Sequence, residues 1–159
     1  MTFNSPNGTR GARQPKAGRI MNWVTARTVN RIRRRGSFMG MTVLVLNTVG
    51  KRTGAQRATP VGWFPGDDGT WLIVASAGGG ARNPAWFYNL AGNPDKVSID
   101  LNRGNIPVVA EQLHGPDRDR AWASITTASP RFLQYERKTD RLIPIIRLTR
   151  RSAIKADTP

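Results

Sequence analysis

A short loop with two glycines and two cations carries the first pattern that could do chemistry. Gly50–Gly54 (GKRTG) stands between two predicted strands, and Arg57 follows just beyond it. Glycine lets the backbone turn sharply and approach a ligand closely. Lys51 and Arg52 offer the charge that cradles phosphate or carboxylate. The spacing is not that of a Walker A loop, so the loop is either an anion cradle or a solvated basic hairpin, and the pattern alone favours the hairpin.

A second candidate is the glycine-rich junction at Ala75–Pro84 (ASAGGGARNP). A predicted strand ends there, three glycines follow, and a helix opens with Asn83 as the expected N-cap and Pro84 as its first residue. Exposed amide groups and the helix dipole make such a junction an anion site. A mobile loop explains the same residues equally well. In the helix that follows, Trp86 and Phe87 are expected in the core, whereas Tyr88 and Asn89 need polar partners if buried.

The composition indicates an anionic partner and disfavours several other chemistries. The 159 residues carry 25 Lys and Arg against 10 Asp and Glu, a net charge of +15, and no acidic residue precedes Asp67. A chain this basic expects nucleic acid, lipid headgroups or a polyanionic ligand. There is no cysteine and His114 is the single histidine. Thiolate sites, a catalytic triad and a multi-histidine metal site are therefore disfavoured.

Short strands separated by turn residues must position these segments. Runs rich in aliphatic and β-branched residues predict strands over residues 41–46, 57–64, 70–75, 96–101, 106–113 and 142–148. The turn chemistry of Asn102–Asn105 predicts a hairpin. Pro144 has no amide hydrogen to donate, so we expect it at an edge or a bulge. Six such strands with few helices indicate a mainly β fold, a small antiparallel barrel or sandwich.

Helices and tails complete the expected organisation. Residues 1–18 are predicted to form a disordered basic tail, and residues 152–159 a C-terminal tail. Residues 19–36 are predicted to form a basic helix with Met21, Thr25, Val29 and Ile32 on one face. Residues 37–151 form the expected ligand-binding domain. Within it we expect helices over residues 84–91, 117–128 with Asp117 as cap, and 131–138. The N-terminus lacks a signal-peptide apolar region and no apolar run is long enough to span a bilayer, so a cytoplasmic location is expected.

Three sequence blocks together resemble the deazaflavin-dependent nitroreductase and quinone reductase family of actinobacteria. They are Thr48–Arg57, Gly79–Leu90 and Thr139–Ile145, in the family's order and spacing, and the similarity covers about residues 41–148. The resemblance implies a split β-barrel that binds coenzyme F420, an 8-hydroxy-5-deazaflavin with a phosphate and an oligoglutamate tail. It also implies hydride transfer from the reduced coenzyme to quinones, nitroaromatics or other activated unsaturated acceptors.

The resemblance further implies roles for individual residues. The anionic tail and phosphate would be held by Lys51, Arg52, Thr53, Arg57, Ala58, Thr59 and Pro60. The deazaflavin would be lined by Ala75, Ser76, Ala77, Ala85, Trp86, Phe87, Tyr88 and Asn89. Catalysis would use the hydroxyls of Ser76 and Tyr135, which could stabilise a developing oxyanion on the acceptor. No metal is implied.

The chain departs from the family at the acceptor side. Members that act on nitroimidazoles have a cluster of tyrosines over the acceptor pocket, of which Tyr135 matches one. Phe132, Ser129 and Gly62 stand where other tyrosines would be, and Ala77 replaces a lysine. The departures leave fold and coenzyme unaffected but weaken the expectation of nitro-drug reduction.

Three hypotheses follow from residues and resemblance together. The first is a quinone reductase that uses a menaquinone-like acceptor at the inner membrane surface, with residues 19–35 against anionic lipid. The second is a nucleic-acid-binding protein, motivated by the net charge but lacking any RNA-binding signature. The third is a split barrel that binds FMN or haem instead.

Overall fold

Strand β2 (Met41–Val49) shows how the core of the protein is built. Leu44 and Leu46 belong to the apolar cluster inside the barrel, whereas Val43 and Val45 pack outside it against Val29 and Ile32. Side chains alternate across a strand, so both faces of β2 are apolar because each is covered. The helical segment on the outer face confirms the predicted apolar positions Val29 and Ile32, which are 5% and 2% exposed.

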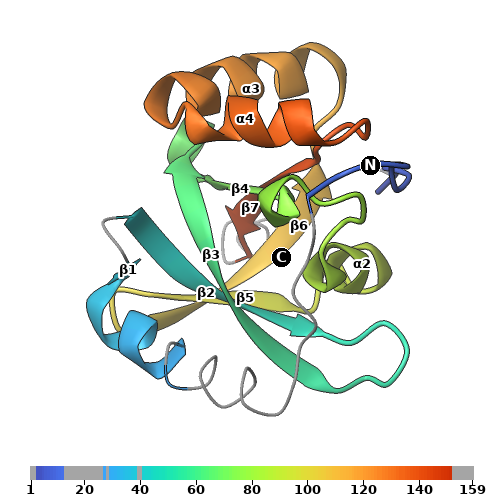
Figure 1. The fold of residues 1–159 in the computed structure, drawn as a ribbon. Helices are drawn as coiled ribbons and strands as arrows, with labels where there is room; N and C mark the ends of the chain where they lie inside the picture. The colour runs from blue at the N-terminus through green and yellow to red at the C-terminus, as the bar shows by residue number, and fades with distance from the viewer. Residues whose placement is uncertain (1–2, 13–26, 28, 39–40, 152–159) are drawn as a thin grey trace.

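The computed structural model describes residues 3–12, 27, 29–38 and 41–151, and its strands form one closed antiparallel sheet (Figure 1). The sheet order is β1-β2-β3-β4-β7-β6-β5, and a further pairing of β2 with β5 closes the barrel. This confirms the predicted mainly β split barrel. The strands beyond β2 are β1 (Ser37–Phe38), β3 (Gln56–Pro65), β4 (Trp71–Val74), β5 (Val97–Leu101), β6 (Gly104–Gln112) and β7 (Ile145–Arg150).

Helices flank the barrel much as the sequence predicts. Residues 27 and 29–35 are helical, and α2 (Ala85–Gly92), α3 (Gly115–Ala128) and α4 (Arg131–Lys138) follow within the barrel domain. Figure 1 shows α3 and α4 together across one end of the barrel and α2 at its side. Short 3-10 turns lie at η1 (Asp67–Gly69) and η2 (Ala77–Gly79).

Two expected helix caps are wrong. Helix α2 has Pro84, not Asn83, at its N-cap position. The Asn83 side chain instead donates to the carbonyl of Ser5 and accepts from Arg141. Helix α3 begins earlier than expected, after His114, and places Asp117 in its first turn rather than at its cap. In both cases a tertiary contact or an earlier helix start overrides the local capping signal.

The N-terminal segment, residues 3–12, lies along the barrel in contrast to the predicted disordered tail. Asn4 donates to Gln112 at 2.8 Å and Ser5 donates to the carbonyl of Leu142 at 3.0 Å. Ala12 forms a parallel bridge with Gly80. Composition predicted disorder because the segment has few apolar groups, but these polar contacts tie it down. The remainder of the expected tail, residues 19–26 and 28 of the expected first helix, and residues 152–159 lie outside the described residues.

Pro144 lies outside strand β7, which begins at Ile145. Its carbonyl accepts a hydrogen bond from the amide of Ala75 at 2.9 Å, so the proline needs neither an edge nor a bulge.

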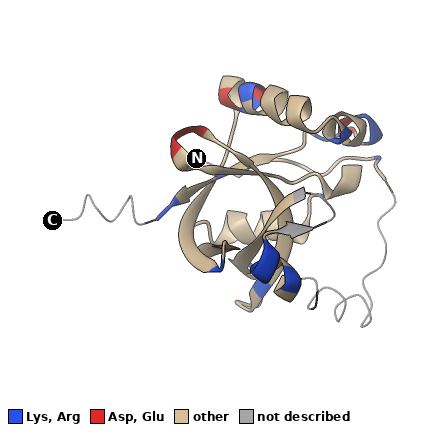
Figure 2. Ribbon diagram, turned by 90° about the vertical axis from the view of Figure 1, so that its left-hand side faces the viewer, with Lys and Arg blue, Asp and Glu red and all other residues tan. Residues whose placement is uncertain are grey.

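Figure 2 shows Lys and Arg on the N-terminal helix, well separated from the acidic residues on α3 and the β3–β4 turn. Within the described residues, no helix combines the length and apolarity that a membrane crossing requires.

Candidate functional site

A basic cavity opens between the β2–β3 hairpin and helix α2. Its volume is about 630 Å³, and its cations are Lys51, Arg52 and Arg57. The other lining residues are Asn7, Gly50, Thr53, Ala85, Tyr88 and Asn89. Among the described residues, none of the three cations forms an ion pair with a carboxylate. The cavity therefore presents positive charge that the protein does not neutralise itself.

Asn89 fixes the hairpin that carries these cations. Its side-chain oxygen accepts the amide of Lys51 at 3.1 Å. The hairpin closes on itself through the amide of Gly50, which donates to the carbonyl of Ala55 at 2.7 Å, and through the Thr53 hydroxyl, which accepts from Ala55 at 3.2 Å. A loop held by its own backbone loses little further freedom when a ligand binds.

Gly92, at the end of α2, is where the Lys51 side chain crosses the helix. A Cβ added at Gly92 would stand 2.9 Å from the Lys51 Cγ atom. Such a contact is too close for two carbon atoms, so the aliphatic stem of Lys51 uses the space that glycine leaves. Two residues of α2 thus position Lys51: Asn89 holds its backbone, and Gly92 leaves room for its aliphatic stem.

A second, smaller cavity lies on the other side of the α2 start. Its volume is about 280 Å³, and Ser76 and Tyr135 line it together with Trp86. Phe132 packs edge-on against Tyr135 with ring centroids 5.4 Å apart, and this contact sets the tyrosine ring. The remaining lining residues are Pro60, Val61, Gly62, Val74, Ala77, Gly78, Pro84 and Arg131.

Arg141 organises the glycine-rich turn that lines the smaller cavity. Its guanidinium is buried and donates to the carbonyls of Ser76 at 2.8 Å and Gly80 at 2.9 Å, and to the Asn83 side chain at 2.9 Å. Burial lowers the pKa of Arg141, but arginine stays protonated in proteins. A planar fork with several donors suits this task because three acceptors converge on it.

Gly79 lets the same turn touch helix α4. Its φ of 86° lies in the left-handed region, and an added Cβ would stand 3.0 Å from the carbonyl oxygen of Tyr135. A side chain there would be strained in its backbone and would push against α4. The turn and the helix that carries Tyr135 are therefore packed backbone to backbone.

The structure brings most of the expected site residues to one of these two cavities. The basic cavity takes Lys51, Arg52, Thr53, Arg57, Ala85, Tyr88 and Asn89, and the smaller one takes Pro60, Ser76, Ala77, Trp86 and Tyr135. Ala58 lines a different cavity on the outer face of the sheet. Thr59 is half-buried, Ala75 and Phe87 are buried in the core, and these three line neither cavity.

Two residues that organise the site were missed by the sequence analysis. Asn7 accepts a hydrogen bond from the Tyr88 hydroxyl at 2.7 Å and lines the basic cavity, yet it lies in the segment expected to be disordered. Arg141 lies inside a block that carries the family resemblance, and the block was the only available signal. Neither role is visible locally because the partners are far away along the chain.

Comparisons with known proteins show which proteins this chain is similar to. The sequence profile of the F420H(2)-dependent quinone reductase family matches residues 17–150. An F420H(2)-dependent quinone reductase of Mycobacterium tuberculosis is 36% identical over 110 residues, which cover 68% of this chain and 73% of the relative. A solved structure of an F420-H2 dependent reductase is 31% identical with a TM-score of 0.60 and covers 67% of this chain and 93% of that one. A further solved chain, described as a domain-swapped dimer, is 29% identical with a TM-score of 0.62, over 82% and 99% of the two chains.

Proposed function

Because the chain belongs to the F420H(2)-dependent quinone reductase family, we propose that its two neighbouring cavities form one site for the coenzyme and its acceptor. Family membership makes the protein an oxidoreductase that uses reduced coenzyme F420 to reduce a quinone. When bound, the reduced coenzyme supplies the hydride. The observation that carries the assignment of the site is the contrast between a cationic cavity and one with hydroxyls and rings, placed on either side of the α2 start.

The basic cavity fits the anionic part of the coenzyme. Lys51, Arg52 and Arg57 have no carboxylate partner among the described residues, and Thr53 and Asn89 add neutral polar groups. Charge-assisted hydrogen bonds to phosphate or carboxylate are the interactions that such a set makes. We propose that these five residues hold the phosphate and the first part of the tail.

The smaller cavity fits a flat ring beside an acceptor. Trp86 and Pro60 offer apolar surface, and Ser76 and Tyr135 offer hydroxyls within the same 280 Å³. In this proposal the hydroxyls donate hydrogen bonds to the acceptor oxygen and so stabilise the negative charge that develops on it. Tight packing of Gly79 against α4 keeps the Ser76 turn and Tyr135 in register.

A cofactor titration tests the assignment of the site. We expect the purified protein to bind coenzyme F420 saturably, whereas FMN and haem added at the same concentration leave their spectra unchanged. A Lys51→Ala/Arg57→Ala variant should bind F420 at least about tenfold more weakly, and Arg137→Ala, an exposed arginine on α4, should not. Saturable binding of FMN or haem with none of F420 would contradict the proposal.

We further propose that the acceptor is a membrane quinone of the menaquinone class and that the N-terminal helix meets the membrane. Val29 and Ile32 bury the apolar side of the helix against β2, so the arginines on its other side are exposed. Exposed basic residues on a helix favour anionic lipid by about 1 kcal/mol each near the surface.

Vesicle sedimentation tests this contact. The protein should sediment with vesicles that contain anionic phosphatidylglycerol and stay in solution with neutral phosphatidylcholine vesicles. Replacing Arg31 and Arg34 by glutamate should abolish sedimentation, while binding of F420 should persist. Equal sedimentation of the variant and the parent protein would rule out the helix as the contact.

A further inference from the structure

One arginine lies at the cavity proposed for the acceptor. Arg131, the first residue of α4, lines the smaller cavity together with Ser76 and Tyr135. Among the described residues of this lining, it is the one that carries a formal charge. Nothing in the described part of the chain forms an ion pair or a hydrogen bond with its guanidinium. The hydroxyls of the cavity are therefore accompanied by a positive charge that the protein does not neutralise.

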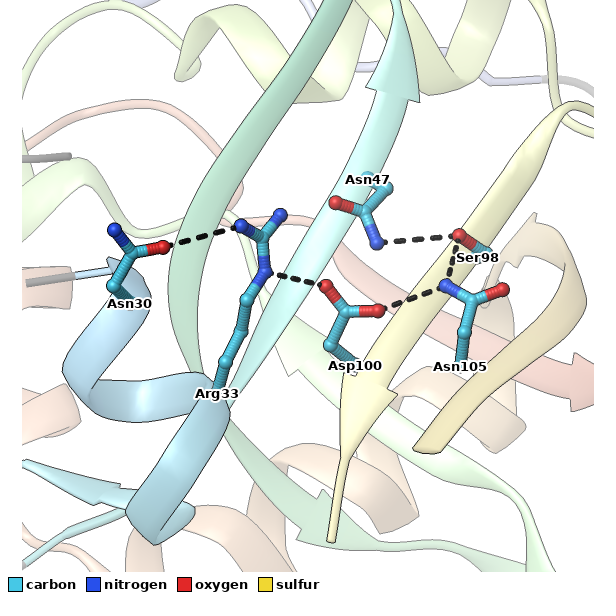
Figure 3. Close-up of polar contacts among 6 residues, drawn as sticks. All are labelled: Asn30, Arg33, Asn47, Ser98, Asp100 and Asn105. Atoms are coloured by element: carbon cyan, nitrogen blue, oxygen red, sulfur yellow. Dashed lines mark hydrogen bonds and ion pairs between the residues drawn. The ribbon is translucent and has the colours of Figure 1, made fainter. Parts of the chain in front are cut away.

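Other arginines show what a structural role looks like in this protein. Arg33 of the N-terminal helix donates to one oxygen of Asp100 at 2.8 Å, and Asn105 donates to the other oxygen at 2.8 Å (Figure 3). Arg141 is buried and meets three acceptors. Arg131 is exposed and has no such partner among the described residues, so its charge does not serve to hold two elements together.

Helix electrostatics disfavour a cation at the place where Arg131 stands. Pro130 occupies the N-cap position of α4, so Arg131 is the first helical residue. The free amide groups at the start of a helix carry partial positive charge, which favours an acidic residue there and opposes a basic one. The stability of α4 therefore does not explain an arginine at this position, whereas a ligand with negative charge in the adjoining cavity does.

Arg131 and Tyr135 share one face of α4. They are four residues apart, which is the spacing that places two side chains next to each other on a helix. Lys138 follows three residues later, and its ammonium group lies 5.9 Å from the centre of the Tyr135 ring. The hydroxyl-bearing residue of the acceptor cavity thus has a cation one helical turn before it and another one turn after it.

Negative charge arises on a quinone when it is reduced by a hydride. The quinone accepts the hydrogen together with its electron pair from the reduced coenzyme, which is oxidised as its own bond to that hydrogen breaks. The quinone thereby gains two electrons and one proton, so the immediate product is a hydroquinone anion. A second proton, from water or a hydroxyl group, then gives the neutral hydroquinone. A cation beside the acceptor lowers the energy of this anion and of the transition state that leads to it.

Resting on the proposed function, we propose that Arg131 is a further acceptor-binding residue that stabilises the negative charge on the quinone. It also makes the cavity prefer quinones that already carry an anionic substituent, such as a carboxylate or a sulfonate on the ring. A neutral quinone meets this stabilisation as it is reduced, whereas an anionic quinone gains it on binding as well. Ser76 and Tyr135 supply hydrogen bonds, and Arg131 supplies the charge.

Binding of two unreactive ligands tests the charge preference without turnover. 2-Naphthoate carries a carboxylate, whereas 2-naphthamide has nearly the same shape and is neutral. Calorimetric titrations use protein saturated with oxidised coenzyme F420, so that the basic cavity is already occupied. The parent protein should bind 2-naphthoate at least about fivefold more tightly than 2-naphthamide at low salt, and added salt should reduce the difference. Arg131→Ala should bind both ligands equally, Arg131→Lys should keep part of the preference, and Arg131→Glu should reverse it.

Steady-state kinetics provide the second measurement. With menadione, a neutral quinone, Arg131→Ala should lower kcat by about fivefold to tenfold, because an exposed charge is partly screened by water. Its KM for menadione should change little, since the charge appears as the reaction proceeds. With 1,4-naphthoquinone-2-sulfonate the KM should rise as well, because this quinone carries its charge from the start.

Arg137→Ala is the matched control, because it removes an exposed arginine from the same helix and does not line the cavity. It should keep both the ligand preference and the kcat of the parent protein. Thermal unfolding should show Arg131→Ala and Arg131→Glu to be at least as stable as the parent protein, since both remove a cation from the helix start.

Two results would overturn the role of Arg131. One is equal affinity of the parent protein for the two naphthalene ligands, and the other is the same loss in Arg137→Ala as in Arg131→Ala. If neither ligand binds to the F420-saturated protein, the smaller cavity is not the acceptor site and the inference fails with it. If F420 itself does not bind, the proposed coenzyme site is contradicted instead.

Discussion

At the scale of single residues, the site depends on side chains whose position is set by a neighbour. Asn89 holds the Lys51 backbone at 3.1 Å, and Gly92 leaves room for the Lys51 stem. Ser76 is placed through its own carbonyl, which accepts from Arg141. The groups proposed to touch the ligand are therefore distinct from the groups that orient them, and the two kinds can be separated by substitution.

Gly92→Ala should weaken coenzyme binding without harming the fold. Gly92 is the last residue of α2 and does not have a positive φ, so its backbone conformation suits alanine and the free energy of unfolding should change little. The added methyl group displaces the Lys51 stem, and the Kd for F420 should rise by about threefold to tenfold, roughly 1 kcal/mol. In a Lys51→Ala background the same change should cost nothing further. A full additional loss in that background would contradict the role given to Gly92.

Ser76→Ala and Tyr135→Phe should each slow quinone reduction more than they weaken binding. Loss of one donor to a developing oxyanion should lower kcat by about a hundredfold, and the Kd for F420 should change little because neither residue lines the basic cavity proposed for the anionic part of the coenzyme. Steady-state kinetics with a soluble menaquinone analogue provide the measurement. Gln134→Ala, exposed next to Tyr135 on α4, is the control. An unchanged kcat in both variants would show that neither hydroxyl meets the acceptor.

At the scale of elements, Arg141 joins the segment before β7 to the glycine-rich turn before α2. Its guanidinium donates to the carbonyls of Ser76 and Gly80, which lie between β4 and α2. Gly79 completes the junction by its close approach to α4. This junction supplies Ser76, Ala77 and Gly78 to the smaller cavity, so its rigidity bears on that cavity.

Arg141→Ala should destabilise the protein by about 3 kcal/mol, because several buried acceptors lose a charged donor at once. Arg141→Lys should lose less stability than Arg141→Ala but should still be less stable than the parent protein, since an ammonium cannot reach three acceptors as a planar fork does. Urea denaturation measures both. Arg137→Ala is the reference for loss of an exposed arginine and should stay within about 0.5 kcal/mol. A loss of stability in Arg141→Ala no larger than this reference would show that the guanidinium does not stabilise the turn.

At the scale of the whole molecule, the N-terminal segment reaches across the barrel and completes the site from outside. Thr9 and Arg10 donate their amides to Asp140 at 2.8 and 3.1 Å, and Asn7 reaches the basic cavity beside Tyr88. The Thr9 side-chain hydrogen bond, followed by the Arg10 amide, lowers the pKa of Asp140 from 3.8 to about 2. The segment is thus fastened by a carboxylate that must stay ionised.

The fastening should release in acid. A carboxyl group whose pKa is lowered in the folded state stabilises that state above its unfolded pKa and loses this effect as pH falls through the folded value. Protection of the Thr9 and Arg10 amides from hydrogen exchange should therefore be complete above about pH 4 and decline as pH approaches 2. In Asp140→Asn the two amides should be poorly protected throughout. Constant protection of the parent protein across this range would show that Asp140 does not hold the segment.

Local residue patterns are enough to predict the strands, the hairpins and the two segments proposed to form the site, because these features depend on near neighbours. The aliphatic and β-branched run of β2, the turn residues at Asn102–Asn105 and the glycines before α2 act within a few residues and can be recognised there. Three family blocks then identified the coenzyme class. Which expected residues reach a cavity was not determined in this way, since Phe87 and Ala75 turn into the core.

Contacts between distant segments could not be predicted from local patterns and are seen only in the folded protein. Arg141 meets Ser76 across 65 positions, Tyr88 meets Asn7 across 81, and Arg33 meets Asp100 across 67. No local period or turn rule encodes such pairs, because burial and hydrogen bonding are satisfied only once the barrel has closed. For the same reason Asn83 is a partner of Arg141 rather than the expected helix cap. The cavity on the outer face of the sheet is likewise lined by residues that are far apart along the chain, from Arg33 of the N-terminal helix to Asn105 of the β5–β6 hairpin.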